Sequence, residues 1–127
     1  MKAVNTLCTA ASIAGDGSTT TYYVPGAGIS LSAYDRAILL VDANCGADSS
    51  IAFTAEVSPD NANWYASYVH NLHAAADEDV LAASVTLTAD TVAALLEVGL
   101  PLPYLRFKVS NANGKDAVVL TAQVVLL

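Results

Sequence analysis

The chain has 127 residues, of which 54% are hydrophobic and only 13% are charged, and its formal net charge is −7. Soluble domains carry about 25% charged residues, so a charge-rich disordered tail is excluded, and no apolar run approaches the ~18 residues of a membrane-spanning helix. The five basic residues form no cluster, which disfavours binding to nucleic acid or to an anionic membrane surface.

The N-terminal part of the sequence is less regular than the rest. Residues 1–18 are expected to form an irregular arm ahead of a single domain over residues 19–127. The stretch Leu7–Ala14 faintly imitates a signal peptide, but hydroxyl side chains interrupt it, so we expect no signal peptide and synthesis in a cytoplasm. Cys8 and Cys45 are expected to be free thiols, with a disulfide between them as the less favoured alternative.

Four strands are predicted over residues 20–69, and the last two of them form a hairpin. Thr20–Val24 is rich in Thr, Tyr and Val and ends at a Pro-Gly loop, while Ala37–Val41 is a continuous apolar run typical of a buried strand. Ile51–Val57 alternates apolar and polar residues, as in a half-buried antiparallel strand. The residues Ser58–Asn61 favour a tight turn, and the chain is predicted to return in a strand over Trp64–Val69.

The third quarter contains a second alternating segment and the one predicted helix. Residues 83–89 alternate between hydroxyl and apolar side chains, which indicates another strand. Residues 90–98 are predicted to form a short helix, because Asp90 is a suitable N-cap and Gly99 ends the pattern. The β-branched valines in this segment leave a strand as the alternative.

The C-terminal quarter predicts a hairpin. Tyr104–Val109 alternates, so one of its faces is expected in the core and the other in water or at an interface. The dipeptide Asn113-Gly114 favours a two-residue hairpin turn. The closing segment Ala117–Leu127 is apolar on both faces toward its end, and an exposed edge of that kind would aggregate. It must therefore be central in a sheet or covered by a neighbouring subunit.

Six to eight short strands at regular spacing, joined by Gly, Pro and Asn turns, predict an all-β fold. The expected architecture is an antiparallel β-sandwich, jelly-roll-like, with one short helix at about residues 90–98.

Candidate metal ligands occur once. His70 and His73, with Asp77 as a third ligand, have a spacing compatible with zinc, but a polar surface loop that contains two histidines is the favoured interpretation. No nucleophile elbow, phosphate loop or activated cysteine is recognisable. We therefore expect a protein that is not an enzyme and uses no cofactor.

The aromatic residues and the apolar last strand are the candidate interface residues. Rings with one polar end suit a protein interface or could stack on sugars. For Trp64 a place in the core beneath the hairpin turn is the favoured alternative. The residues predicted for interface or assembly contacts are Tyr22, Tyr23, Trp64, Tyr65, Tyr104, Val124 and Leu126.

Two segments carry a resemblance to a known group of proteins. They are AILLVDANCGADSSIAFTAEVSPDNANWY and PYLRFKVSNANGKDAVVLTAQVVLL, which together cover about half of the chain. They resemble small β-sandwich virion proteins of tailed bacteriophages, of the head decoration or cement type. The matching residues are Ser58, Asp60, Asn63, Trp64, Tyr104, Arg106, Phe107 and Val109.

The resemblance implies a structural protein of the virion. The expected function is capsid decoration, in which the chain binds and stabilises the head lattice. Its expected partners are the major capsid protein and other copies of itself, with a trimer as one expected stoichiometry. A carbohydrate-binding module of a tail or adhesin, or a tail tube or adaptor subunit, is the alternative.

Overall fold

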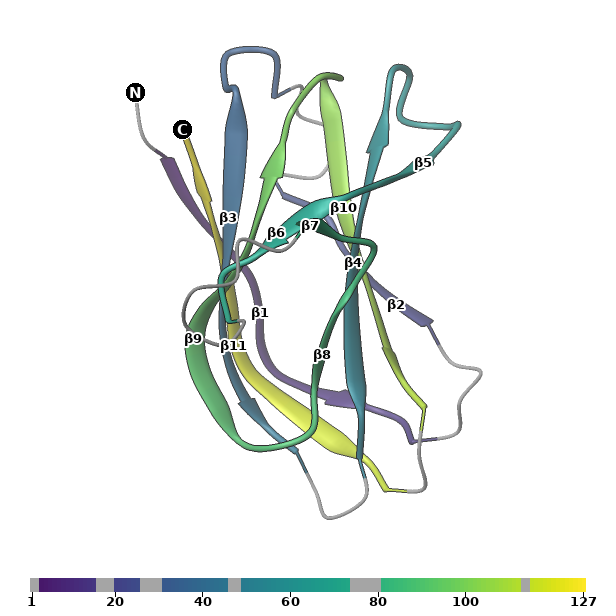
Figure 1. The fold of residues 1–127 in the computed structure, drawn as a ribbon, viewed down its shortest axis with the longest axis vertical. Coiled ribbons are helices and arrows are strands. Elements are labelled where there is room, and N and C mark those ends of the chain that lie inside the picture. Colours follow the sequence, from purple (N-terminus) through teal and green to yellow (C-terminus); the bar gives the residue numbers. More distant parts are fainter. Residues whose placement is uncertain (1–2, 16–19, 26–30, 46–48, 74–80, 113–114) are drawn as a thin grey trace.

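The computed structural model describes residues 3–15, 20–25, 31–45, 49–73, 81–112 and 115–127. These residues form two antiparallel β-sheets that face each other around an apolar core, so the predicted all-β sandwich is confirmed (Figure 1). Its strands are β1 (Ala3–Ile13), β2 (Thr20–Tyr23), β3 (Arg36–Asn44), β4 (Ile51–Ser58), β5 (Tyr65–Ser67), β6 (Val69–Asn71), β7 (Leu81–Ala82), β8 (Val85–Leu87), β9 (Thr91–Gly99), β10 (Tyr104–Asn111) and β11 (Ala117–Leu126). The short strands β5 to β8 raise their number above the six to eight expected.

The order of the strands places β11 inside a sheet. The six-stranded sheet has the order β1-β11-β3-β9-β6-β7, and the five-stranded sheet has the order β2-β10-β4-β5, with β8 paired to β4 beside β5. The apolar closing segment therefore lies inside the sheet, between β1 and β3, which is one of the two arrangements that the sequence predicted for it. The cysteines are free thiols, as expected.

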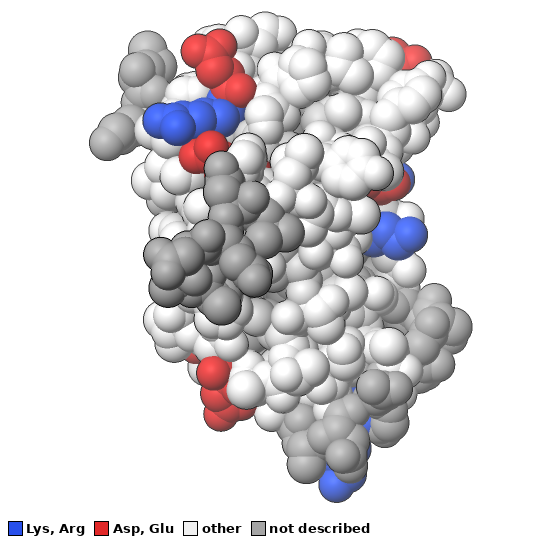
Figure 2. Space-filling model, viewed as in Figure 1, with Lys and Arg blue, Asp and Glu red and all other residues white. Residues whose placement is uncertain are grey.

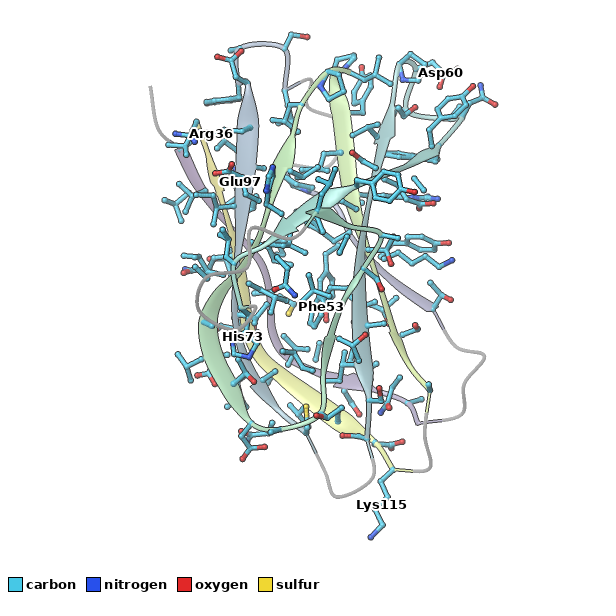
Figure 3. The ribbon with its side chains drawn as sticks, in the orientation of Figure 1. Arg36, Phe53, Asp60, His73, Glu97 and Lys115 are labelled. Atoms are coloured by element: carbon cyan, nitrogen blue, oxygen red, sulfur yellow. The ribbon has the colours of Figure 1, made fainter. Side chains whose placement is uncertain are left out.

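Alternation along the strands builds the core between the two sheets. In β4 and β10 every second side chain is fully buried, including Phe53 and Phe107, and Phe53 lies midway between the sheets in Figure 3. In β3 the inward residues Ala37, Leu39 and Val41 are buried, whereas the residues between them are half exposed on the outer face. Two-residue periodicity thus decides which side chains remain available for contacts with other molecules.

The predicted helix at residues 90–98 is wrong, because this segment is strand β9 and pairs with β3 over its whole length. The reason lies in a bulge: Leu39 faces Leu96 and Leu40 faces Ala94, so Leu95 is an extra residue in β9. Because of the bulge, the neighbours Leu95 and Leu96 are both buried, and the alternation of buried and exposed residues in β9 is interrupted. The resulting spacing of apolar residues resembles that of one face of a helix. Asp90 is no helix cap either, since its Oδ1 accepts a hydrogen bond from the amide of Cys45 at 2.9 Å.

The expectation of an irregular arm is also wrong for residues 3–13. They form β1, which pairs with β11 from Ala3 opposite Leu126 to Ile13 opposite Ala117, so the two ends of the chain lie side by side (Figure 1). A register shift at Leu7 and a left-handed backbone at Ala10 (φ 54°) interrupt the alternation of β1 and hide its strand character in the sequence.

A buried amide ties the start and end of the fold together. The side chain of Asn111 is fully buried, and its Nδ2 donates hydrogen bonds to the carbonyls of Lys115 (2.8 Å) and Ile13 (3.3 Å). Its Oδ1 accepts a hydrogen bond from the amide of Ser50 at 3.0 Å. One side chain therefore connects the end of β1, the segment before β4 and the β10–β11 connection.

Candidate binding surfaces

Four side chains on the outer face of the five-stranded sheet form one cluster. The guanidinium carbon of Arg106 lies 4.0 Å from the ring centroid of Tyr22 and 4.4 Å from that of Trp64, so the cation is stacked against both rings. The Nε of Arg106 donates a hydrogen bond to Oε1 of Glu56 at 2.8 Å. We call these four residues the aromatic–arginine cluster.

The cluster is assembled from three neighbouring strands and one turn. Arg106 and Glu56 are directly opposite each other in β10 and β4, and β2 supplies Tyr22 from the other side of β10. Lys108 is the next outward residue of β10 and is the cross-strand partner of Tyr22. Two of the chain's five basic residues thus occupy successive outward positions of one strand in a protein of net charge −7.

The turn before Trp64 is held by one carboxylate. Oδ1 of Asp60 accepts hydrogen bonds from the amides of Ala62 (3.0 Å) and Asn63 (2.8 Å) and from the Ser58 hydroxyl (3.0 Å). Its Oδ2 accepts another from Nδ2 of Asn63 at 2.6 Å. Hydrogen bonds from these donors, first of all the amides of Asn63 and Ala62, hold the pKa of the Asp60 carboxyl well below its ordinary value. The carboxylate fixes this turn at one end of the molecule, where Figure 3 labels it.

The structure brings together two of the predicted interface residues, Tyr22 and Trp64. The ring of Trp64 is half buried against Arg106 on the outer face, so the favoured prediction that it fills the core is wrong. Tyr104 is half buried on the same outward row of β10 as Arg106, so it flanks the cluster. Tyr65, with 58% of its surface exposed, is the cross-strand partner of the inward residue Val57 and therefore lies on the other face of β5 from the cluster.

The remaining predicted interface residues, Tyr23, Val124 and Leu126, are buried in the core. They offer no surface to a partner in this fold, and this corrects the expectation that they lie at an interface. Burial raises the pKa of the Tyr23 phenol, with the neighbouring Cys8 thiol as a further cause, and the hydroxyl has no hydrogen-bond partner among the described residues.

Glu56 and Arg106 are the cluster residues that sequence reasoning did not propose as site residues. The signal was present in the alternation, because both residues occupy polar positions of strands whose other positions are buried. Their pairing depends on the register between β4 and β10, which separates them by 50 residues in sequence.

A second candidate surface is the outer face of the six-stranded sheet, which we call the apolar sheet face. The register places Val4, Val125, Ile38 and Glu97 in one row across β1, β11, β3 and β9, and Thr6, Gln123, Leu40 and Ala94 in the next. Strands β1 and β11 contain no charged residue. The charged residues of β3 and β9 are Arg36, Asp42 and Glu97. Arg36 forms an ion pair with Glu97 at 3.3 Å near one end of the sheet (Figure 3).

The apolar sheet face is hollowed beside its most exposed apolar side chain. Val92 has 81% of its surface exposed, and a hollow of about 390 Å³ lies next to it. The residues that line this hollow include Leu40, Asp42, Val92, Ala94, Thr121 and Gln123. The short side chain of Ala94 lies among longer neighbours in this lining.

Charged side chains are also scarce on the face of the molecule that Figure 2 shows. Figure 2 shows a face on which the described charged side chains lie toward the ends and edges of the molecule, and the other described side chains between them are uncharged. This distribution agrees with the low charge content of the sequence.

The predicted metal site receives no support from the described residues. His70 lies in β6 opposite Glu97, His73 lies in the following turn, and Asp77 falls outside the described part of the chain. Within the described ranges, no three His, Cys, Asp or Glu side chains are close enough together to hold a metal ion. No helix in the same residues is long and apolar enough to cross a membrane.

The fold and its surfaces define the class of this protein as an all-β sandwich of two antiparallel sheets. No protein-family model and no curated protein matches the chain in sequence. Among solved structures it is similar to the SPBc2 prophage-derived protein YomS, with a TM-score of 0.55 and 13% identity over 99% of this chain and 92% of that one. A xylan-binding module, CBM15, follows with a TM-score of 0.44 and 13% identity over 99% and 97% of the two chains. At this identity the likeness to YomS establishes the fold.

Proposed function

We propose that this chain is a structural subunit of a phage virion, and specifically a head decoration protein that assembles through the apolar sheet face. Its partners are the major capsid protein and other copies of itself, and its action is to stabilise the head lattice by contacts between proteins. The origin of YomS in a prophage supports the phage assignment, since the two chains share one fold over nearly their whole lengths.

The observation that carries the proposal is the composition of the apolar sheet face. Its central rows present Val125, Ile38 and Leu40 between neighbours that are almost all uncharged, and Val92 projects beside the hollow. Exposed apolar side chains gathered on one face of a sheet often mark a site of protein interaction. Burial of apolar area contributes about 25 cal/mol per Å² before the entropic cost of association.

Binding to purified heads tests this proposal. Heads that lack the chain are mixed with the native protein, with Leu40→Asp and with the matched control Thr54→Asp, which places the same charge on the outer face of the other sheet. Native protein and Thr54→Asp are expected to co-sediment with the heads and raise their melting temperature, whereas Leu40→Asp is expected to do neither.

Localisation of the chain on intact particles distinguishes a head decoration protein from a tail subunit. Electron cryo-microscopy density for the chain on the head lattice would support decoration. Density in the tail would overturn the decoration role in favour of a tail subunit, and absence from particles and from heads would overturn the virion assignment altogether.

A further inference from the structure

We infer that the aromatic–arginine cluster is a binding site for a carbohydrate chain. The site lies on the outer face of the five-stranded sheet, on the opposite side of the sandwich from the apolar sheet face. A subunit could therefore use one face for assembly and present the other to a polysaccharide. The inference does not depend on the proposed role in the head lattice.

Accessible ring surface is the first argument. Tyr22 keeps 45% of its surface exposed although its ring contacts Arg106, and Trp64 is only partly buried. Tyr104 adds a further half-buried ring on the same outward row of β10 as Arg106. Amphipathic rings that stay partly open to water are suited to the apolar CH faces of sugar rings, because such contacts need flat apolar area and tolerate hydroxyl groups at the edges.

The second argument is that the guanidinium of Arg106 and the carboxylate of Glu56 are fixed in position beside the rings. The hydrogen bond from Nε of Arg106 to Glu56, together with the contacts to the rings of Tyr22 and Trp64, holds the guanidinium in one place. Among the described residues its terminal nitrogens have no hydrogen-bond partner, so they can donate to sugar hydroxyls. The second carboxylate oxygen of Glu56 can accept from one. Fixed donors and acceptors beside an aromatic surface give a ligand its orientation.

The charge of the site favours sugar over nucleic acid, which can also stack on aromatic rings. Arg106 and Lys108 are opposed by Glu56 within the site and by Asp60 in the adjacent turn. A single strand of nucleic acid needs several uncompensated cations along its path, and this chain has a net charge of −7. Hydroxyl groups, in contrast, bind to donors and acceptors whose charges compensate each other.

The test uses the position of Trp64 as the only tryptophan of the chain. Labelled native protein is applied to an array of hexose, N-acetylhexosamine and uronic acid oligosaccharides. Each oligosaccharide that binds is then titrated against the native protein while the fluorescence of Trp64 is followed. We expect at least one to bind and to change the emission. On the array, where the label and not Trp64 reports binding, labelled Trp64→Ala and labelled Tyr22→Ser are expected to bind at least about tenfold more weakly than the native protein.

The matched control is Tyr68→Ala, which removes a ring that is 66% exposed but lies outside the cluster, and it should bind like the native protein. Circular dichroism on every variant separates loss of binding from loss of fold, and the two cluster variants change different elements, strand β2 and the segment before β5. The inference is overturned if no oligosaccharide on the array binds, or if binding survives both cluster substitutions. It is also overturned if a single-stranded oligonucleotide, and no sugar, binds in a Trp64-dependent way.

Discussion

Arg106 and Glu56 are direct cross-strand partners in β10 and β4, and a hydrogen bond of 2.8 Å joins Nε of the first to Oε1 of the second. Only 21% and 17% of their side-chain surfaces are exposed, because the rings of Tyr22 and Trp64 cover the guanidinium. The ion pair is therefore shielded from water much more than an ordinary surface pair. It links β2, β10, β4 and the turn before Trp64 into one unit.

A double-mutant cycle should detect this shielding. We expect Arg106→Ala and Glu56→Ala each to lower the free energy of unfolding by about 1–3 kcal/mol, and the double variant to lose less than the sum. Urea denaturation at pH 7 measures all three. Lys108→Ala, on the same face of β10, serves as the control and should change stability by less than about 0.5 kcal/mol. Strict additivity of the two substitutions would contradict a direct interaction.

The buried amide of Asn111 should be among the most sensitive positions in the chain. Replacement by Ala removes hydrogen bonds to Ser50, Ile13 and Lys115 and leaves their main-chain groups without these partners. We expect a loss of about 2–4 kcal/mol in the free energy of unfolding. Asn44→Ala, at the exposed end of β3, is the matched control. A loss below about 1 kcal/mol would show that water replaces the amide at little cost.

Two glycines should respond to alanine in opposite directions. A Cβ on Gly15 would collide with the carbonyl of Lys115, which belongs to the main chain and cannot swing away, whereas a Cβ on Gly99 would meet no atom within 4 Å. We expect Gly15→Ala to lower the free energy of unfolding by about 1–3 kcal/mol and Gly99→Ala to leave it unchanged or raise it by up to about 1 kcal/mol. Equal melting temperatures for the two variants would be inconsistent with this packing.

The Asp60 carboxylate predicts a pH-dependent contribution to stability. Because its pKa is lowered in the folded state, the stabilisation is complete well above the ordinary value of 3.8 and is lost as the pH falls below that value toward the folded pKa. Asp60→Asn should therefore melt below the native protein at pH 7, and the difference should narrow between pH 5 and pH 2. In carbon NMR spectra of the folded protein, the Asp60 carboxyl should remain ionised at pH 3. A titration midpoint near 3.8 would refute the hydrogen-bonded turn.

Sequence patterns were informative where a strand is regular and its neighbours are close in the chain. The alternation of residues 51–57 and 104–109 predicted both the strands and the sides that Phe53, Phe107 and Arg106 occupy. It was misleading in β1 and β9, where bulges shift the side chains from one face to the other. Local periodicity carries no information on such bulges, because they depend on the partner strand.

The candidate sites were predictable only in part for a related reason. Exposed aromatic residues were recognised as a class, but the place of Trp64 depends on Arg106, which follows it by 42 positions and reaches it only through the register of β4 with β10. Tyr23 and Tyr22 are adjacent in sequence and lie on opposite faces of β2, one buried and one exposed. Composition cannot separate two such neighbours, whereas the packing of the sheets does.

The central position of β11 also has a consequence for how the chain folds. Strand β11 joins β1 to β3, so β1 cannot become part of the six-stranded sheet until residues 117–126 are present. During synthesis, the edges of β1 and β3 that pair with β11 therefore remain unpaired until β11 has been made. Folding that depends on contacts between distant parts of a chain is slow and exposes such edges to aggregation. Removal of residues 117–127 should therefore yield a chain that binds chaperones or precipitates, rather than a smaller sandwich.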